Sequence, residues 1–317
     1  MAVSFYSQIA ANKRNSLTLA LLVVLILGAL GATIGYAVSG SAQGSVIVTV
    51  LALGGGVLAA LVSYYLGDRI VLAASGARPV TAASHPQLWN VVTELTTAAG
   101  IPMPRVFEID DTAPNAFATG RDPEHASIAV TRGLLEKLDR EELAGVIGHE
   151  LSHVRNFDIR FALLVGVLVG SIALLADLFL RMTFWGGFGG RRSSSDREGG
   201  GLQAIAVVLA ILLAILAPIA ARLVQLAVSR QREYLADASS VELTRNPYGL
   251  ERALAVIARD TEPLEVANRA TQHLYFANPI KKLGDPSRLF STHPPIVDRI
   301  NRLRALTGEQ PLGGPDA

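Results

Sequence analysis

Three observations predict an α-rich integral membrane protein that also carries a smaller α+β domain. Half of the 317 residues are hydrophobic and only 17% are charged, which is too apolar for an ordinary soluble domain. Four apolar stretches are each long enough for a membrane-crossing helix, which needs about 20 residues. The remaining segments are polar and combine strand-like alternation with the longer period of amphipathic helices.

The four apolar stretches divide the chain. They cover about 16–38, 45–66, 161–180 and 202–228. The first two predict an N-terminal membrane hairpin within residues 1–72. The first stretch is longer than the core of a signal peptide and the second follows at once, so we expect the hairpin to be retained. The last two predict further hydrophobic segments within 159–228, separated by a loop rich in Gly, Ser and Arg at 186–200.

Basic residues beside the first two stretches predict the orientation of the chain. Lys13 and Arg14 precede the first stretch, and Arg69 and Arg78 follow the second. The loop 39–44 between the two stretches has no charge. Because Lys and Arg concentrate on the cytoplasmic side of a membrane, we expect the N-terminus and the polar part after the hairpin to face the cytoplasm.

The loop at 186–200 does not follow this bias, because it carries three arginines. The sequence therefore leaves open whether segments 159–185 and 201–228 cross the bilayer fully. The other interpretation is that they lie partly against the protein or line a cavity.

Two polar parts, residues 73–158 and 229–317, are predicted to form the α+β domain. The first part has a helical pattern at 89–99 and strand patterns at 105–109, 115–119 and 127–131. A Gly-Arg-Asp-Pro turn joins the last two strands. These patterns predict a small sheet packed beside helices.

One motif in this domain points to metal chemistry. Residues 149–153 read His-Glu-Leu-Ser-His, and a capping box of Asp139 and Glu142 predicts that a helix begins just before them. Positions i and i+4 share a helix face, so His149 and His153 can bind one zinc ion. Glu150 can then serve as the base that activates water. This arrangement indicates a zinc hydrolase, of which peptidases are the commonest kind.

A catalytic zinc needs a third protein ligand, and the chain has no cysteine to supply it. Glu233 is the best candidate, because it directly follows the fourth apolar stretch. Asp237 lies one turn further along the same helix face and can accept a hydrogen bond from His149. The alternative interpretation is a solvated charged turn after a membrane helix. The other histidines remain possible ligands; they are His85, His125, His273 and His293.

Two further segments are candidates for the catalytic machinery. His293 lies between Thr292 and two prolines that fix its direction, and it can donate a hydrogen bond to the oxyanion of amide hydrolysis. The alternative for His293 is an ordinary turn at the start of a helix. A strand beside a zinc site can bind an extended peptide at the sheet edge, unless it is a core strand. The residues of this candidate strand are Asn115, Ala116, Phe117 and Ala118.

These motifs together resemble the HtpX family of heat-shock membrane metalloproteases. The likeness covers nearly the whole chain and rests on four segments in the right order. They are residues 115–120 (Asn-Ala-Phe-Ala-Thr-Gly), 149–153 (His-Glu-Leu-Ser-His), 230–237 (Arg-Gln-Arg-Glu-Tyr-Leu-Ala-Asp) and 291–295 (Ser-Thr-His-Pro-Pro). One departure is Phe157, where the pattern of the family has glycine.

The resemblance implies a multi-pass inner-membrane zinc endopeptidase whose site faces the cytoplasm and which degrades misfolded or damaged membrane proteins. His149, His153 and Glu233 would hold one Zn²⁺ per chain, Glu150 would be the general base, and Asp237 would support a ligand. Partners would be the lipid bilayer and membrane-protein or unfolded-polypeptide substrates.

Other functional classes are weighed against this interpretation. A CAAX-type prenyl-protein endoprotease and a non-catalytic zinc-binding membrane scaffold remain alternatives. An intramembrane protease is excluded, because charged residues flank the zinc motif on both sides. The net charge of +1 gives no reason to expect nucleic acid as a partner. The sequence is compatible with a homo-oligomer.

Overall fold

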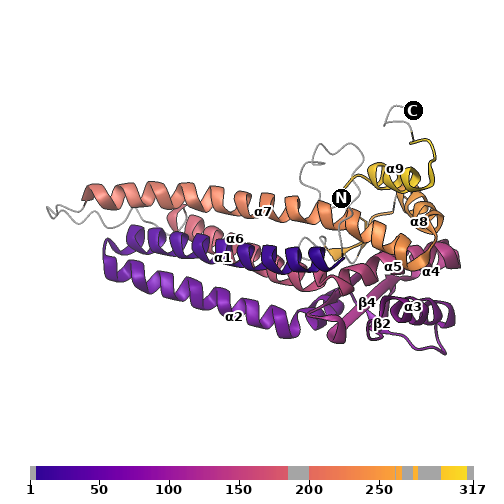
Figure 1. Ribbon diagram of the computed structural model, residues 1–317. Helices are drawn as coiled ribbons and strands as arrows, with labels where there is room; N and C mark the ends of the chain where they lie inside the picture. Colours follow the sequence, from indigo (N-terminus) through magenta and orange to yellow (C-terminus); the bar gives the residue numbers. More distant parts are fainter. Residues whose placement is uncertain (1–4, 185–199, 261, 266–273, 278–293, 313–317) are drawn as a thin grey trace. The chain divides into compact units, whose positions relative to one another are not determined.

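The computed structural model describes residues 5–184, 200–260, 262–265, 274–277 and 294–312 (Figure 1). The chain divides into two compact units. A helical unit comprises 13–63 and 164–225. A mixed unit comprises 1–12, 64–163 and 226–317.

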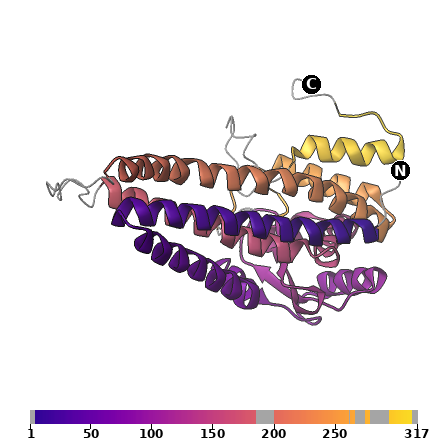
Figure 2. The same cartoon turned by 60° about the vertical axis from the view of Figure 1, so that its left-hand side comes forward.

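The helical unit is built from the C-terminal parts of two long helices and the N-terminal parts of two others (Figures 1 and 2). They are α1 (Phe5–Ser39), α2 (Ala42–Ala74), α6 (Asp158–Phe184) and α7 (Gly200–Thr244). Its core joins leucines of α1, such as Leu27 and Leu30, to Ile172 of α6 and to alanines of α7. Small residues let the helices approach closely: a side chain at Gly35 would meet the Gly44 carbonyl at 2.7 Å.

Two of these helices contain segments long and apolar enough to cross a membrane, among the residues that the structure describes. They are Ala42–Ala74 and Gln203–Ala220. The described apolar part of α1, Val24–Ser39, is shorter. Large apolar side chains of α2 are exposed, for example Leu51 and Leu58, as expected for a helix whose solvent is lipid.

The mixed unit contains a four-stranded sheet in the order β1-β2-β4-β3. The strands are β1 (Arg78–Pro79), β2 (Arg105–Ile109), β3 (Ala116–Gly120) and β4 (Ala126–Thr131). β2 runs parallel to β4, whereas β3 runs antiparallel to β4 through a tight connection that includes the short helix η1 (Pro123–His125). The three predicted strands are confirmed, and β3 is an edge strand.

Five further helices pack with this sheet or with one another. They are α3 (Pro86–Ala99), α4 (Arg132–Lys137), α5 (Arg140–Arg155), α8 (Pro247–Arg259) and α9 (Ile296–Thr307). The predicted capping box starts α5: Asp139 accepts from the Glu142 N–H, and Glu142 accepts from the Asp139 N–H. The zinc motif therefore begins about two turns after the capped N-terminus of α5.

Glycines bring other helices against α5. A Cβ on Gly145 would lie 2.6 Å from the Leu250 backbone nitrogen of α8, and a Cβ on Gly148 would lie 2.9 Å from the Ser240 hydroxyl of α7. The Ser240 hydroxyl donates to the Gly145 carbonyl at 2.6 Å. Side chains at these positions would push α7 and α8 away from the zinc motif.

Phe157 occupies the position where the family resemblance predicts glycine. Its φ of 61° is left-handed, a conformation that costs a residue with a Cβ roughly 1–2 kcal/mol. The Arg160 guanidinium lies 4.8 Å from the Phe157 ring centroid, a cation–π contact that offsets part of this cost. The turn that glycine would form is therefore kept, and it directs Asp158 back toward α5.

Candidate metal centre

Three potential ligands meet between α5 and the C-terminal part of α7. The Nε2 atoms of His149 and His153 are 3.1 Å apart. Glu233 places Oε2 3.6 Å from His149 Nε2 and Oε1 3.5 Å from His153 Nε2. A tetrahedral zinc with bonds of about 2.0–2.2 Å would separate its ligand atoms by about 3.3–3.6 Å. The two histidines approach different oxygens of Glu233, and one ligand atom from each residue lies within 4.8 Å of the others. The three groups thus converge closely enough to hold a single zinc ion.

The donor set also fits zinc chemically. Two imidazoles and one carboxylate are the ligands of many catalytic zinc sites, which leave a fourth position open. His149 and Glu233 are buried, whereas His153 is partly exposed. Among the residues that the structure describes, these three form the group that can hold a metal ion.

The Nδ1 atom of each histidine lies within hydrogen-bond distance of a carboxylate oxygen. Asp237 Oδ1 lies 2.9 Å from His149 Nδ1, and Asp158 Oδ2 lies 3.1 Å from His153 Nδ1. Each imidazole can donate its Nδ1 proton to its carboxylate, which leaves the Nε2 lone pair directed at the metal position. The sequence predicts the Asp237 contact, whereas the Asp158 contact is evident only from the structure. The sequence carries no local signal for this contact, because it depends on the left-handed turn at Phe157.

Arg299 of α9 is a second supporting residue that the sequence does not predict. Its side chain is buried and bonds Asp237 twice, through Nε at 2.9 Å and Nη2 at 2.7 Å. Burial alone would raise the pKa of Asp237, but the charge of Arg299 holds that pKa below its usual value. A signal was present in the pattern of α9, since Arg299 shares its buried face with Ile300 and Leu303.

We expect Arg299→Met to destabilise the protein by roughly 3–5 kcal/mol, because the Asp237 carboxylate would remain buried without its cation. Arg299→Lys should fall between this variant and the natural chain, since an ammonium restores charge without the two-point contact. Unfolding of the detergent-solubilised protein measures the effect, with Arg304→Met on the same helix as the control. Equal stability of Arg299→Met and Arg304→Met would contradict the assignment.

Glu150 is buried beside the three ligands. Burial raises the pKa of its carboxyl group, while the charges of His149 and His153 and a backbone hydrogen bond from Ala118 lower it. The net result is a pKa above the usual value for glutamate. A carboxylate with a raised pKa is a stronger base, which suits proton transfer near neutral pH. A bound dication would act against this shift by stabilising the carboxylate.

The other predicted histidines contribute nothing to this cluster in the described structure. His85 lies 3.4 Å from Glu108, and His125 lies against Asp122. Neither belongs to the group that can hold a metal ion. His273 and His293 fall outside the described residues, as does the segment that leads to Pro294.

The candidate substrate strand lies beside Glu150, at the edge of the sheet. Asn115 exchanges two hydrogen bonds with Ala277 through its side chain, and the Phe276 N–H donates to the Ala116 carbonyl at 2.7 Å. Phe117 is fully buried and packs edge-to-face on Tyr275. Ala118 follows, with its backbone hydrogen-bonded to Glu150. The first half of the edge is thus covered by residues 276–277.

The fold and the site together define a zinc metallopeptidase: a buried His-Glu-x-x-His helix whose histidines converge with a glutamate from a later helix. The Peptidase family M48 model matches residues 82–307. A protease HtpX homolog of Ligilactobacillus salivarius is 46% identical over 94% of this chain and 98% of its own length. Another, from Streptococcus uberis, is 45% identical over 94% and 99%.

The chain therefore belongs to peptidase family M48, within its HtpX group. The crystal structure of S. mikatae Ste24p is similar at 20% identity with a TM-score of 0.47, and the match covers 93% of this chain and 66% of that one. Membership of a peptidase family with its zinc residues in place sets aside the non-catalytic scaffold considered from the sequence.

Proposed function

We propose that this chain is a membrane-bound endopeptidase with one zinc per chain, and that its substrates are misfolded or damaged membrane proteins. The observation that carries the proposal is the convergence of His149, His153 and Glu233 beside Glu150, in a chain whose described residues include two candidate membrane spans. Detergent-solubilised protein should cleave an unfolded membrane protein faster than the folded form of the same protein. Cleavage confined to a farnesylated CAAX peptide would instead favour the prenyl-protein endoprotease.

A few residues would carry out the proposed peptide hydrolysis. His149, His153 and Glu233 would hold the zinc ion, which would supply the Lewis acidity of the reaction. Glu150 accepts a proton from the attacking water and passes it to the nitrogen of the leaving amine. Asp237 and Asp158 hold the two imidazoles in place, and Arg299 holds Asp237.

We infer that the substrate backbone pairs with β3 close to Ala118. Edge pairing reads the main chain and only alternate side chains, so many unfolded sequences can be accommodated. Asn115 directs its carbonyl toward β4, where the Thr131 N–H donates to it. By the alternation of an antiparallel ladder, Ala116 and Ala118 direct theirs outward. Residues 276–277 already bond Asn115 and Ala116, and the Ala118 N–H already bonds Glu150. The Ala118 carbonyl is therefore the outward group of this stretch that is left for a substrate.

Proline substitution tests this inference. Ala118→Pro should reduce peptide hydrolysis at least about tenfold while zinc content is retained, because proline removes the N–H that bonds Glu150 and disturbs the edge that carries the outward Ala118 carbonyl. Ala116→Pro is the matched control, since the Ala116 N–H bonds locally to the Asn115 side chain. If both variants keep full activity, or if both lose zinc, the strand serves only as core structure.

We also propose that the catalytic site faces the cytoplasm of the inner membrane. The proposal rests on Lys13, Arg14, Arg69 and Arg78 around an uncharged loop. Topology reporters fused after Gly76 and after Ala317 should both report the cytoplasm. An external signal from the first fusion would reverse the orientation. An external signal from the second alone would mean that α6 and α7 do not make two crossings.

A further inference from the structure

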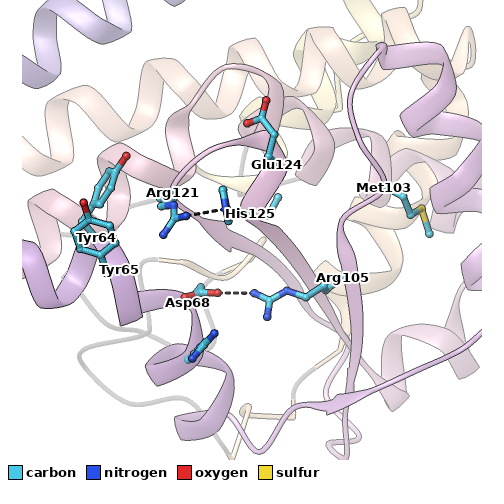
Figure 3. Close-up of a pocket in the computed structure, with 10 residues that line it drawn as sticks. Tyr64, Tyr65, Asp68, Met103, Arg105, Arg121, Glu124 and His125 are labelled. Atoms are coloured by element: carbon cyan, nitrogen blue, oxygen red, sulfur yellow. Dashed lines mark hydrogen bonds and ion pairs between the residues drawn. The ribbon is translucent and has the colours of Figure 1, made fainter.

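A polar cavity of about 460 Å³ lies in the mixed unit, between the end of α2 and the β3–β4 connection (Figure 3). Its size is within the roughly 300–1,000 Å³ of sites for small molecules. The metal-site residues are not among the residues that line it. The lining side chains that matter for its chemistry are Tyr64, Tyr65, Arg69, Arg105, Arg121 and His125.

Arg121 is held in place by aromatic rings and hydrogen bonds. Its guanidinium carbon lies 5.8 Å from the Tyr64 ring centroid and 5.5 Å from that of Tyr65. Its Nη2 lies 2.7 Å from His125 Nε2, and Arg160 donates to its backbone carbonyl. Figure 3 shows Arg121 and the two tyrosines on the same side of the cavity. A cation fixed in this way loses little side-chain entropy on binding an anion.

The residues that line the cavity carry an excess of positive charge, although Asp122 next to the lining pairs with Arg121 at 3.5 Å. Arg69, Arg105 and Arg121 exceed the two acidic residues of the lining, Asp68 and Glu124, by one. Arg105 pairs with Asp68 and also donates to Ser127, so its charge is largely satisfied. Guanidinium groups bind phosphate oxygens through paired hydrogen bonds. A phosphodiester, which carries one negative charge, would balance the lining.

The place of the cavity along α2 indicates where such a phosphodiester comes from. Tyr64 and Tyr65 are followed by Asp68 and Arg69, the first charged residues after the apolar run of this candidate span. Tyrosine concentrates at membrane interfaces, where lipid headgroups lie. Tyr65, Leu66 and Ile70 expose 58%, 44% and 52% of their surface, so an apolar face leads directly to the cavity.

We propose that this cavity binds the phosphodiester of an anionic phospholipid, with Arg121 and Arg69 as its cationic contacts. The acyl chains lie along the exposed apolar face of α2, while the headgroup enters between the tyrosines and the β3–β4 connection. Basic pockets beside membrane helices commonly recognise anionic lipids in this way. The proposal does not depend on the proteolytic function.

The test measures lipid-dependent thermal stability of the full chain in detergent, in the Glu150→Gln background to prevent self-cleavage. Dioctanoyl phosphatidylglycerol should raise the melting temperature with a saturable dependence on concentration. Dioctanoyl phosphatidylcholine and sodium phosphate at equal concentrations should not. Arg121→Gln and Arg69→Gln should each weaken the apparent affinity for phosphatidylglycerol about tenfold or more, since each loses a charge-assisted contact.

Arg132→Gln is the matched control, because Arg132 is an exposed arginine of the same unit that pairs with Asp110 and Glu136 away from the cavity. Equal stabilisation by phosphatidylcholine, or by phosphate alone, would overturn the proposal. An equal loss of affinity in Arg132→Gln would overturn it as well, since attraction would then be unspecific. If Arg121→Gln does not fold, exposed Arg69→Gln decides the outcome.

Discussion

Replacing Glu150 by glutamine is expected to abolish proteolysis while zinc remains bound. Glutamine has nearly the same shape as glutamate but cannot accept the proton of the attacking water. Loss of a general base slows a reaction about 10²–10⁴-fold. The ligand triangle of His149, His153 and Glu233 does not include Glu150, so the metal should stay in place.

Hydrolysis of an unfolded membrane substrate and zinc content per chain are the two quantities to measure. Glu141→Gln is the control, because Glu141 lies on the same helix but is exposed and pairs with Arg252. This control should retain both zinc and activity. A Glu150→Gln protein that cleaves at near the natural rate would reject the mechanism. Loss of zinc in this variant would make Glu150 a structural residue of the metal site.

Replacing Glu233 by alanine should remove zinc, whereas replacing Asp237 should only weaken its binding. Glu233 contributes one of three ligand atoms, and two histidines alone make a poor site. Asp237 acts on the metal through His149, and loss of such a supporting carboxylate usually lowers metal affinity about 10–100-fold. The two variants therefore separate a ligand from a residue that orients a ligand.

Metal titration of the purified proteins measures this difference. Asp237→Asn is the better second variant, because asparagine retains the shape beside Arg299 and limits damage to the fold. Exposed Glu242 on the same helix supplies the control, Glu242→Ala. Normal zinc binding by Glu233→Ala would place the third ligand elsewhere, and His293 would be the next candidate.

The parts of the fold that could be predicted are those whose signals are local. β2 shows strand-like alternation, β3 and β4 are short runs joined by a Gly-Arg-Asp-Pro turn, and the Asp139–Glu142 capping box predicts the start of α5. The third ligand was also predictable, since Glu233 follows an apolar helix that must end near the zinc motif. The ends of the long helices could not be predicted from the limits of the apolar stretches. α7 continues to Thr244 because good helix formers follow its apolar part and no proline intervenes before Pro247.

The parts that could not be predicted depend on contacts between distant segments. Arg299 reaches Asp237 from a helix far along the chain, and no local pattern specifies its partner. Residues 276–277 cover half of the β3 edge, although their sequence has no pairing signal. At Phe157 the tertiary structure imposes a left-handed turn that the residue itself disfavours, so local preference would predict the wrong backbone conformation there.

The order of the metal ligands along the chain has a consequence for biosynthesis. His149 and His153 leave the ribosome before α6 and most of α7 have been made, and Glu233 follows only after the apolar part of α7. Until then the nascent chain holds two of its three ligands, and Arg299 comes later still. The zinc site is therefore complete only after the last helices of the chain have been made.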